Sequence, residues 1–304
     1  MSEFRCIGRT DAGLVRDGNE DTFLAARIGD SPMLLCAAID GVGGYDGGEV
    51  AARIAADTLL AYVEEHQEEK PLDLVKKALT EANNAIYRTK TAGSEYPRMA
   101  CVASVALVDT ELKMAHIAHV GDTRIYLYGP EGLRKITHDH SMVGYMEDHE
   151  DITEFQAMNH PQRNEIDRCL GESLREVGQE GFIESGIYPI PAEGKLMLCS
   201  DGLTDMVTSK EITEILSSEK STASKVDSLI VAANSNGGKD NVTVVLLEFL
   251  PNSSAPASLE PVEVLDDGEA EGSLEKKRLL FRLLLSIIVG MVLGFFLGMI
   301  VYDF

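Results

Sequence analysis

The chain has 304 residues, and because 50 of them are Asp or Glu against 27 Lys or Arg, its formal net charge is −23. A surplus of this sign repels a phosphate backbone, so we expect no nucleic acid among the partners. The length allows a full hydrophobic core in one large domain or two small ones, and motifs spread from residue 4 to residue 250 favour one.

Apolar runs punctuated by Gly and Asp predict strands through much of the chain. In the N-terminal half the predicted strands are residues 4–10, 22–28, 33–39, 101–108, 112–120 and 124–128, the last three as a β-meander. Apolar residues at helical spacing predict two antiparallel helices over 48–65 and 72–87, on either side of Lys70-Pro71.

A polar stretch over residues 137–162 has little core pattern, and we interpret it as a mobile flap. Beyond it, strands are predicted at 181–187, 195–199 and 242–249, and helices at 210–216 and 224–233. Strands that precede paired helices, without regular βαβ alternation, are typical of an α+β fold. The sequence therefore predicts a central β-sandwich of two mainly antiparallel sheets flanked by helices.

The C-terminal part has a different composition. Residues 251–275 carry Pro, Ser and seven acids without Lys or Arg, so we expect an acidic, disordered linker. Residues 283–302 are twenty residues without a charge, and at about 1.5 Å each they cover the roughly 30 Å of a bilayer core. A single transmembrane helix is predicted there, within a segment 276–304 that begins with a basic flank.

The flanking charges predict an orientation. Four basic residues precede the span, whereas only Asp303-Phe304 follow it, so the positive-inside rule keeps the globular domain in the cytoplasm, anchored to the cell inner membrane. The basic residues are Lys276, Lys277, Arg278 and Arg282. Three glycines at intervals of four, Gly290, Gly294 and Gly298, form a smooth stripe that suggests a homodimer through this helix.

The cysteines and the N-terminus agree with that compartment. The five cysteines contain no C-x-x-C pair, and most lie in apolar runs where a reduced thiol behaves as a small hydrophobic side chain. They are Cys6, Cys36, Cys101, Cys169 and Cys199. Met1–Arg5 lacks the apolar core of a signal peptide.

Five acidic clusters adjoin apolar, β-branched runs from end to end of the globular part. They are Arg16–Asp21, Asp40–Gly44, Gly121–Arg124, Ser200–Gly202 and Asp240-Asn241. Carboxylates at strand ends can converge on one hard-metal site, since Mg²⁺ and Mn²⁺ prefer oxygen ligands and take only a few from the protein. No single cluster could form such a site alone.

The order, spacing and composition of these clusters resemble the metal-dependent serine/threonine protein phosphatases of type 2C, the PPM family, in their bacterial form. The resemblance covers roughly residues 4 to 249, which makes 1–250 the expected catalytic domain. It implies the family's helix-flanked β-sandwich and the hydrolysis of phosphoserine and phosphothreonine in proteins, opposing serine/threonine kinases. Two Mn²⁺ or Mg²⁺ ions would lower the pKa of a bridging water, which then attacks phosphorus in line.

The resemblance also implies residue roles. Asp40 would bridge the two metals and the Gly41 carbonyl would hold one of them, with Glu20, Asp201 and Asp240 as further ligands. Arg16 would grip the phosphate with its bidentate fork, which Lys cannot reproduce. Asp21 would orient a metal-bound water or Arg16.

Three positions leave alternatives open. Asp122 would share a third, weaker metal with Asp201, but a β-turn aspartate hydrogen-bonded by Arg124 explains the same residues. Val42 stands where eukaryotic relatives carry a histidine proposed as general acid, so the leaving-group proton must come from water or another group. Met99–Val102 replaces the Met-Gly-Thr-Thr of many relatives, where we expect a change of packing only.

Other binding sites fit the residues less well. Gly41–Asp46 resembles a dinucleotide-binding loop, but Asp46 replaces the third glycine and the βαβ continuation is missing. An EF-hand would need oxygen ligands where Val42 and Gly44 stand. A zinc site is disfavoured because His116 and His119 should face opposite sides of a strand. His138 and His140 have no third ligand nearby in the sequence, so we interpret them as a polar surface pair.

Two rival functions remain to be separated from the phosphatase. One is a catalytically silent phosphoprotein-binding module tethered to the membrane. The other is an enzyme that acts on a phosphorylated regulator in a partner-switching pathway, which differs in substrate only. Tethering would also raise the effective concentration toward a membrane-bound serine/threonine kinase, which we expect as the antagonist.

Overall fold

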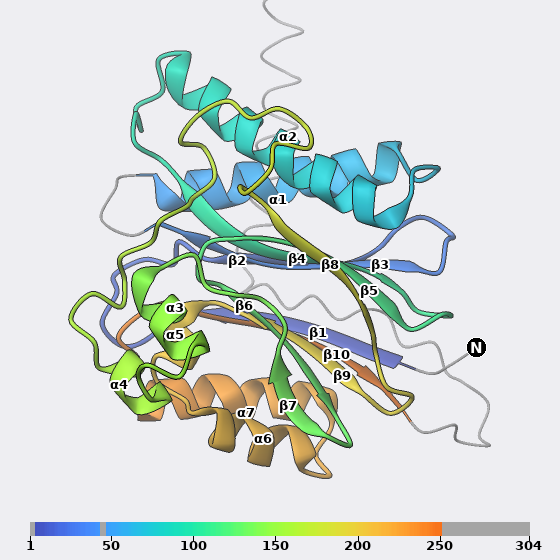
Figure 1. Ribbon diagram of the computed structural model, residues 1–304, viewed down its shortest axis with the longest axis vertical. Coiled ribbons are helices and arrows are strands. Elements are labelled where there is room, and N and C mark those ends of the chain that lie inside the picture. The colour runs from blue at the N-terminus through green and yellow to red at the C-terminus, as the bar shows by residue number, and fades with distance from the viewer. Residues whose placement is uncertain (1–3, 43–46, 251–304) are drawn as a thin grey trace, which may run out of the picture. The chain divides into compact units, whose positions relative to one another are not determined.

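The computed structural model describes residues 4–42 and 47–250 (Figure 1). Its strands are β1 (Phe4–Asp11), β2 (Thr22–Arg27), β3 (Met33–Gly41), β4 (Cys101–Asp109), β5 (Met114–Val120), β6 (Arg124–Gly129), β7 (Gly132–Lys135), β8 (Glu184–Pro189), β9 (Lys195–Cys199) and β10 (Val242–Phe249). Its helices are α1 (Gly48–Glu65), α2 (Pro71–Thr91), α3 (Met142–Asp148), α4 (Glu154–Met158), α5 (Asp201–Thr204), α6 (Ser209–Ser217) and α7 (Thr222–Ser235).

The strands form two five-stranded sheets in which every pairing between named strands is antiparallel. One sheet has the order β1-β10-β9-β6-β7 and the other the order β2-β3-β4-β5-β8. The first strand pairs with the last along its whole length, from Phe4 opposite Phe249 to Asp11 opposite Val242. The predicted α+β sandwich of antiparallel sheets is confirmed.

Three hydrophobic cores hold the layers together. The core between the sheets contains Leu34, Cys36, Ile117, Leu198 and Val245 among others, because inward-facing residues alternate along each strand. A second core joins α1 and α2 to the outer face of the β2–β8 sheet, and a third joins α6 and α7 to the outer face of the other sheet. Figure 1 shows these helix pairs as the outer layers of the sandwich.

The predicted β-meander was wrong in one respect. β4 and β5 pair as expected, but β6 pairs with β9 and β7 in the other sheet. The chain therefore crosses between the two sheets at Gly121–Thr123. Apolar patterning shows that a segment is a strand but not which strand it pairs with, and this crossing places Asp122 at the end of the sandwich.

Residues 137–162, interpreted as a mobile flap because their sequence has little core pattern, contain more regular and buried structure than that pattern indicated. The segment contains the short helices α3 and α4, and it buries Thr137, Asp139, Ser141, Val143 and Ala157. Helix α4 begins with a capping box, in which the Thr153 and Gln156 side chains bond each other's backbone N–H groups. Each helix is too short for helical periodicity to be visible in the sequence.

The linker predicted at 251–275, the segment 276–304 with its span at 283–302, and the glycines Gly290, Gly294 and Gly298 lie outside the described residues. Across residues 4–42 and 47–250, none of the helices combines the length and apolar character needed to cross a bilayer.

Candidate active site

All seven residues predicted for the site line one pocket at one end of the sandwich, with a volume of about 80 Å³. The pocket is lined by Arg16, Glu20, Asp40, Gly41, Val42, Val102, Asp122, Asn164, Ile166, Asp201, Asp240 and Asn241. These residues come from segments far apart in the sequence. The convergence of the acidic clusters that the sequence suggested is therefore present in the fold.

The strands position each acid at their ends. Asp40 is the penultimate residue of β3, Asp201 opens α5 two residues after β9, and Asp240 lies two residues before β10. Glu20 precedes β2, and Asp122 lies in the crossing from β5 to β6. Because β9 and β10 pair directly, with Cys199 opposite Val244, their acidic neighbours meet at the same edge.

Close backbone approach at Gly41 is part of this arrangement. Its N–H donates to the Glu20 carbonyl at 3.2 Å, and this bond holds the loop between β1 and β2 against the end of β3. A Cβ at Gly41 would lie 2.5 Å from the Gly48 carbonyl carbon and 2.8 Å from the Glu20 carbonyl oxygen. Only glycine fits between these two backbone segments.

Asn241 connects the two loops that carry the acids, a role that the sequence did not reveal. Its side-chain carbonyl accepts from the Glu20 N–H at 2.9 Å, and its amide donates to the carbonyls of Ala12 and Gly18 at 3.0 and 2.8 Å. A side-chain amide that bonds three backbone groups fixes the β1–β2 loop against the start of β10. Its place directly after Asp240 was the only signal in the sequence.

The pocket concentrates negative charge. Asp40 and Asp201 have pKa values raised well above the usual range, first because protein surrounds them and then because neighbouring carboxylates repel the ionised form. Burial is also the main cause that raises the pKa of Asp122 to about 7 and that of Asp21 to about 6. Among the described residues lining the pocket, Arg16 is the only one with a positive charge.

This donor set fits hard divalent cations. Both carboxylate oxygens of Asp21 are buried, and neither accepts a hydrogen bond of good geometry within residues 4–42 and 47–250, although the Thr243 and Ser200 hydroxyls lie close enough to lower its pKa. Mg²⁺ and Mn²⁺ prefer carboxylate and carbonyl oxygens as ligands. Oxygens that lack hydrogen-bond donors from the protein are available to bind such a cation. A cation would remove the repulsion that holds these pKa values high.

Arg16 lies on the β1–β2 loop at the edge of the pocket. Its Nη2 donates to Asp240 Oδ2 at 2.7 Å, and its side chain is 40% exposed. The structure therefore places it beside the acids, as predicted, but pairs it with one of the predicted ligands. Within the described part of the chain, Arg16 donates to Asp240 and not to Asp21, so the suggestion that Asp21 orients Arg16 has no support.

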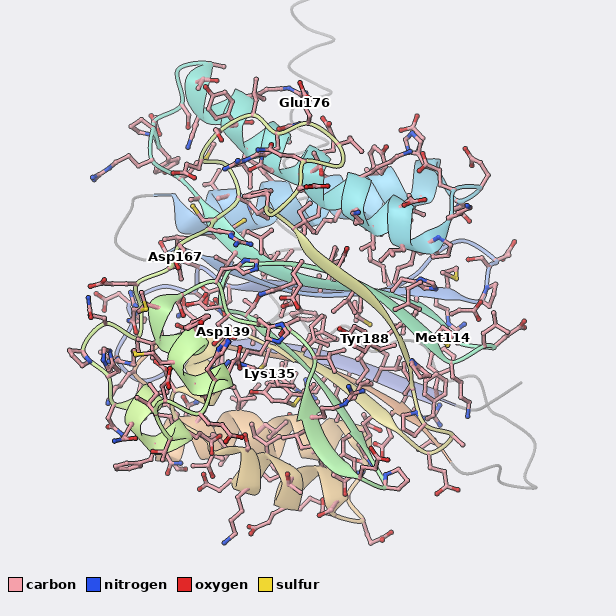
Figure 2. All side chains as sticks on the ribbon, in the orientation of Figure 1. Met114, Lys135, Asp139, Asp167, Glu176 and Tyr188 are labelled. Carbon is pink, nitrogen blue, oxygen red and sulfur yellow. The ribbon has the colours of Figure 1, made fainter. Side chains whose placement is uncertain are left out.

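Asp122 is shared with a second hollow of about 30 Å³, which Asp139, Asp201 and Asp205 also line. Arg124 does not hold Asp122 in the way that the turn interpretation required. Its guanidinium donates to Asp139 Oδ2 at 2.6 Å and to Glu147 Oε2 at 2.7 Å. Figure 2 shows Asp139 beside α3, close to Lys135.

Asn164 and Ile166 line the pocket from the segment between α4 and β8, and sequence reasoning missed both. Nearby, the Arg163 Nε donates to Asp205 Oδ2 at 2.7 Å and so joins this segment to α5. The segment has neither helical nor strand periodicity, so no signal in the sequence could have placed it over the acids.

The structure also bears on two other kinds of site that the sequence raised, a dinucleotide-binding loop and a histidine cluster. β3 pairs antiparallel with both β2 and β4, which contradicts a dinucleotide-binding βαβ unit at Gly41. The interpretation of His138 and His140 as a polar surface pair holds for His138 only, because His140 packs beside His119, with ring centroids 4.9 Å apart. His138 is exposed, as a surface residue should be, whereas His140 is half-buried.

Comparison with known proteins agrees with the site. The family model "Protein phosphatase 2C" matches residues 15–246. Serine/threonine phosphatase stp of Listeria monocytogenes is 35% identical over 251 residues, which is 79% of this chain and 94% of that protein. Protein phosphatase PhpP of Streptococcus pneumoniae is 32% identical over 252 residues, covering 79% and 95%.

Solved structures show the same fold. The serine/threonine phosphatase PstP/Ppp of Mycobacterium tuberculosis is 31% identical with a TM-score of 0.69, covering 81% of this chain and 98% of that one. The catalytic domain of PstP in complex with two manganese ions is 30% identical with a TM-score of 0.68, covering 82% and 99%. The family match, the identity and the fold together show that this chain belongs to the protein phosphatase 2C family.

Proposed function

We propose that this chain is a Mn²⁺- or Mg²⁺-dependent protein phosphatase that hydrolyses phosphoserine and phosphothreonine in proteins. The observation that carries the proposal is the pocket itself, in which acids at or near the ends of separate strands converge beside a single arginine. Metal-dependent dephosphorylation of Ser and Thr is the activity of the family to which the chain belongs.

The residues that would hold the cations are Glu20, Asp40, the Gly41 carbonyl, Asp201 and Asp240. The two manganese ions of the PstP catalytic domain support two such cations here. Asp122 and Asp201 line both hollows and would hold a third. When bound, divalent cations activate water as a nucleophile and offset the charge of the phosphoryl group.

The protein's own residues bind and orient the substrate. Arg16 lies at the edge of the pocket and presents a planar guanidinium, which suits two phosphate oxygens at once. It would exchange its contact with Asp240 for the phosphate when substrate and cations are present. Val42 lines the pocket but has no titratable proton, so the leaving oxygen would take its proton from water or from another group.

Substitution of Asp201 tests the proposal. The full-length protein should release phosphate from a phosphothreonine peptide as Mn²⁺ is titrated into the millimolar range, and EDTA should stop the release. Asp201→Asn should abolish turnover, because it removes a charge that the cations need. Asp30→Asn, at an exposed turn, is the matched control and should keep wild-type activity. A wild-type protein that binds the peptide but releases no phosphate would instead support the silent binding module.

A membrane tether belongs to the same proposal, with residues 1–250 as catalytic domain, 251–275 as linker and 276–304 as basic flank and transmembrane helix. The uncharged run at 283–302 and its basic flank support an inner-membrane location with the catalytic domain in the cytoplasm. A membrane serine/threonine kinase would then be a substrate and antagonist. Truncation after Leu250 should spare activity on soluble peptides and slow it on such a kinase, and equal rates would contradict the tether.

The glycine stripe Gly290, Gly294 and Gly298 supports a homodimer through that helix. Crosslinking of the full-length protein in detergent should capture dimers, and Gly294→Leu should remove them. Self-association that persists in this variant would place the interface elsewhere.

A further inference from the structure

A polar cluster outside the proposed catalytic machinery lies beside the crossing from β5 to β6. It contains His119 from β5, Glu184 from β8, and His138 and His140 from the segment that leads into α3. The His119 Nδ1 bonds the Ser104 hydroxyl at 2.9 Å and its Nε2 bonds the His138 carbonyl at 3.2 Å. Because a carbonyl only accepts, Nε2 of His119 carries the proton and Ser104 donates to Nδ1.

The spacing of the cluster would suit a metal ion, but most of its ligand atoms are already engaged in hydrogen bonds. Atoms of His119, His140 and Glu184 lie within 4.8 Å of one another. However, both nitrogens of His119 are engaged, and both Glu184 oxygens accept from His138, at its N–H and its Nδ1. The Arg168 guanidinium, 3.3 Å from His140 Nε2, would also repel a cation. Hydrogen bonding, rather than metal binding, accounts for the arrangement.

His140 holds the turn before Asp122 at two points. Its backbone N–H donates to the Gly121 carbonyl at 2.7 Å, and its Nδ1 accepts from the Gly121 N–H at 3.1 Å. Gly121 has a φ of +111°, and a Cβ there would collide with the Val102 side chain. The turn is therefore tight, and both of its backbone polar groups depend on one histidine.

The same residue also holds the chain that returns from α4. The His140 carbonyl accepts from the Asp167 N–H at 2.7 Å, between Ile166 of the pocket and Arg168. Figure 2 shows Asp167 on this returning segment, above α3. His140 thus joins the Asp122 turn, the entry to α3 and the Asn164–Ile166 wall of the pocket.

We propose that His140 is a positioning residue for the phosphatase site, which acts through the acceptor at its Nδ1. The inference rests on the proposed function. Two N–H donors, Gly121 and Arg168, face the ring from opposite sides, but a neutral imidazole has one acceptor nitrogen. The backbone amide is the shorter contact, at 3.1 Å against 3.3 Å, and it belongs to a buried residue. The acceptor therefore serves Gly121, and the proton lies on Nε2.

Two substitutions separate this role from packing. Asn places its side-chain oxygen near the position of Nδ1, whereas Gln places it near Nε2. For His140→Gln we expect the Mn²⁺ concentration for half-maximal activity to rise about tenfold, and for His140→Asn to stay within about twofold of wild type, because only Gln leaves the buried Gly121 N–H unpaired. His149→Asn, on the exposed end of α3, is the matched control and should change neither activity nor Tm.

The measurements are phosphate release, Mn²⁺ binding by electron paramagnetic resonance, and Tm for each full-length variant. Equal impairment of the Asn and Gln variants, or none in either, overturns the proposal. A zinc ion that copurifies with wild type and is lost from both variants also overturns it. If the wild-type protein proves inactive, the proposed function fails. The Mn²⁺ affinities of the variants still test the role of His140 in that case. If a variant fails to fold, the ¹⁵N chemical shifts of the His140 ring in the wild-type protein show which nitrogen carries the proton. A proton on Nδ1 would refute the proposal that Nδ1 accepts from Gly121.

Discussion

Gly41→Ala is the sharpest test of how the site is built. The new methyl carbon would lie 2.5 Å from the Gly48 carbonyl carbon and 2.8 Å from the Glu20 carbonyl oxygen. Carbon atoms in proteins pack best at about 3.5–4.0 Å, so these two backbone segments must separate by about 1 Å. Both obstacles are main chain, and neither can move away by rotating a side chain.

The expected effect falls on two quantities. Overpacking of this kind costs about 1–3 kcal/mol of unfolding free energy. A displacement of about 1 Å at a reacting centre can lower the rate roughly a hundredfold. Because Glu20 and Asp40 flank the contact, we expect the loss of Mn²⁺-dependent turnover to exceed what the change in stability explains.

The assay is kcat for p-nitrophenyl phosphate over a Mn²⁺ titration, together with Tm by circular dichroism. Gly18→Ala is the matched control, because it lies on the loop that leads to Glu20 and a Cβ there meets nothing within 4 Å. The control should be neutral or slightly stabilising, by up to about 1 kcal/mol. Wild-type Tm and activity in Gly41→Ala would refute the close approach that we derive from the fold.

Other expectations concern charge. Burial and neighbouring acids raise the pKa of Asp21 to about 6 and that of Asp122 to about 7, above the ordinary value of 3.8, so the metal-free fold binds protons that the unfolded chain releases. Its stability should therefore fall as pH rises from about 4 to 7, and a flat Tm profile in EDTA would contradict this. Asn241→Ala should lower the unfolding free energy by about 1–3 kcal/mol and weaken Mn²⁺ binding in calorimetry, because the half-buried N–H of Glu20 loses its acceptor. Arg16→Lys should lower kcat/KM for a phosphopeptide about tenfold while Mn²⁺ binding persists, and unchanged kcat/KM would remove the bidentate role.

Local patterns predicted elements well where they were long. The strands β9 and β10 and the helix α1 have the predicted bounds, since each buries a continuous apolar run or an apolar helix face. Strand β7, with four residues and none of them buried, has no such signal. Short helices such as α3 and α4 likewise gave no periodicity.

The site was predictable for a different reason from the parts that were missed. Acids next to strand ends are visible in one sequence, and strand ends lie at the edges of a sheet. Which acids share one end of the sandwich does not follow from that pattern, and the resemblance to the type 2C phosphatases supplied it. Asn164 and Ile166 lie on an irregular segment, whose path depends on contacts such as Arg163 with Asp205. Proximity of this kind depends on the folded chain as a whole.

Stability and cation binding are coupled in this architecture. The three cores supply the free energy that holds mutually repelling carboxylates together, and the raised pKa values of Asp40 and Asp201 are the sign of that repulsion. A cation that binds only the folded state adds RT ln(1 + [L]/Kd), or about 2.7 kcal/mol at a hundred times Kd. Asp201→Asn should therefore raise the metal-free Tm above pH 7 and reduce the gain in Tm from Mn²⁺. A higher metal-free Tm together with a smaller Mn²⁺-induced gain in Tm would identify Asp201 as part of a cation-binding site. A polar cluster that only contributes packing would not show both changes.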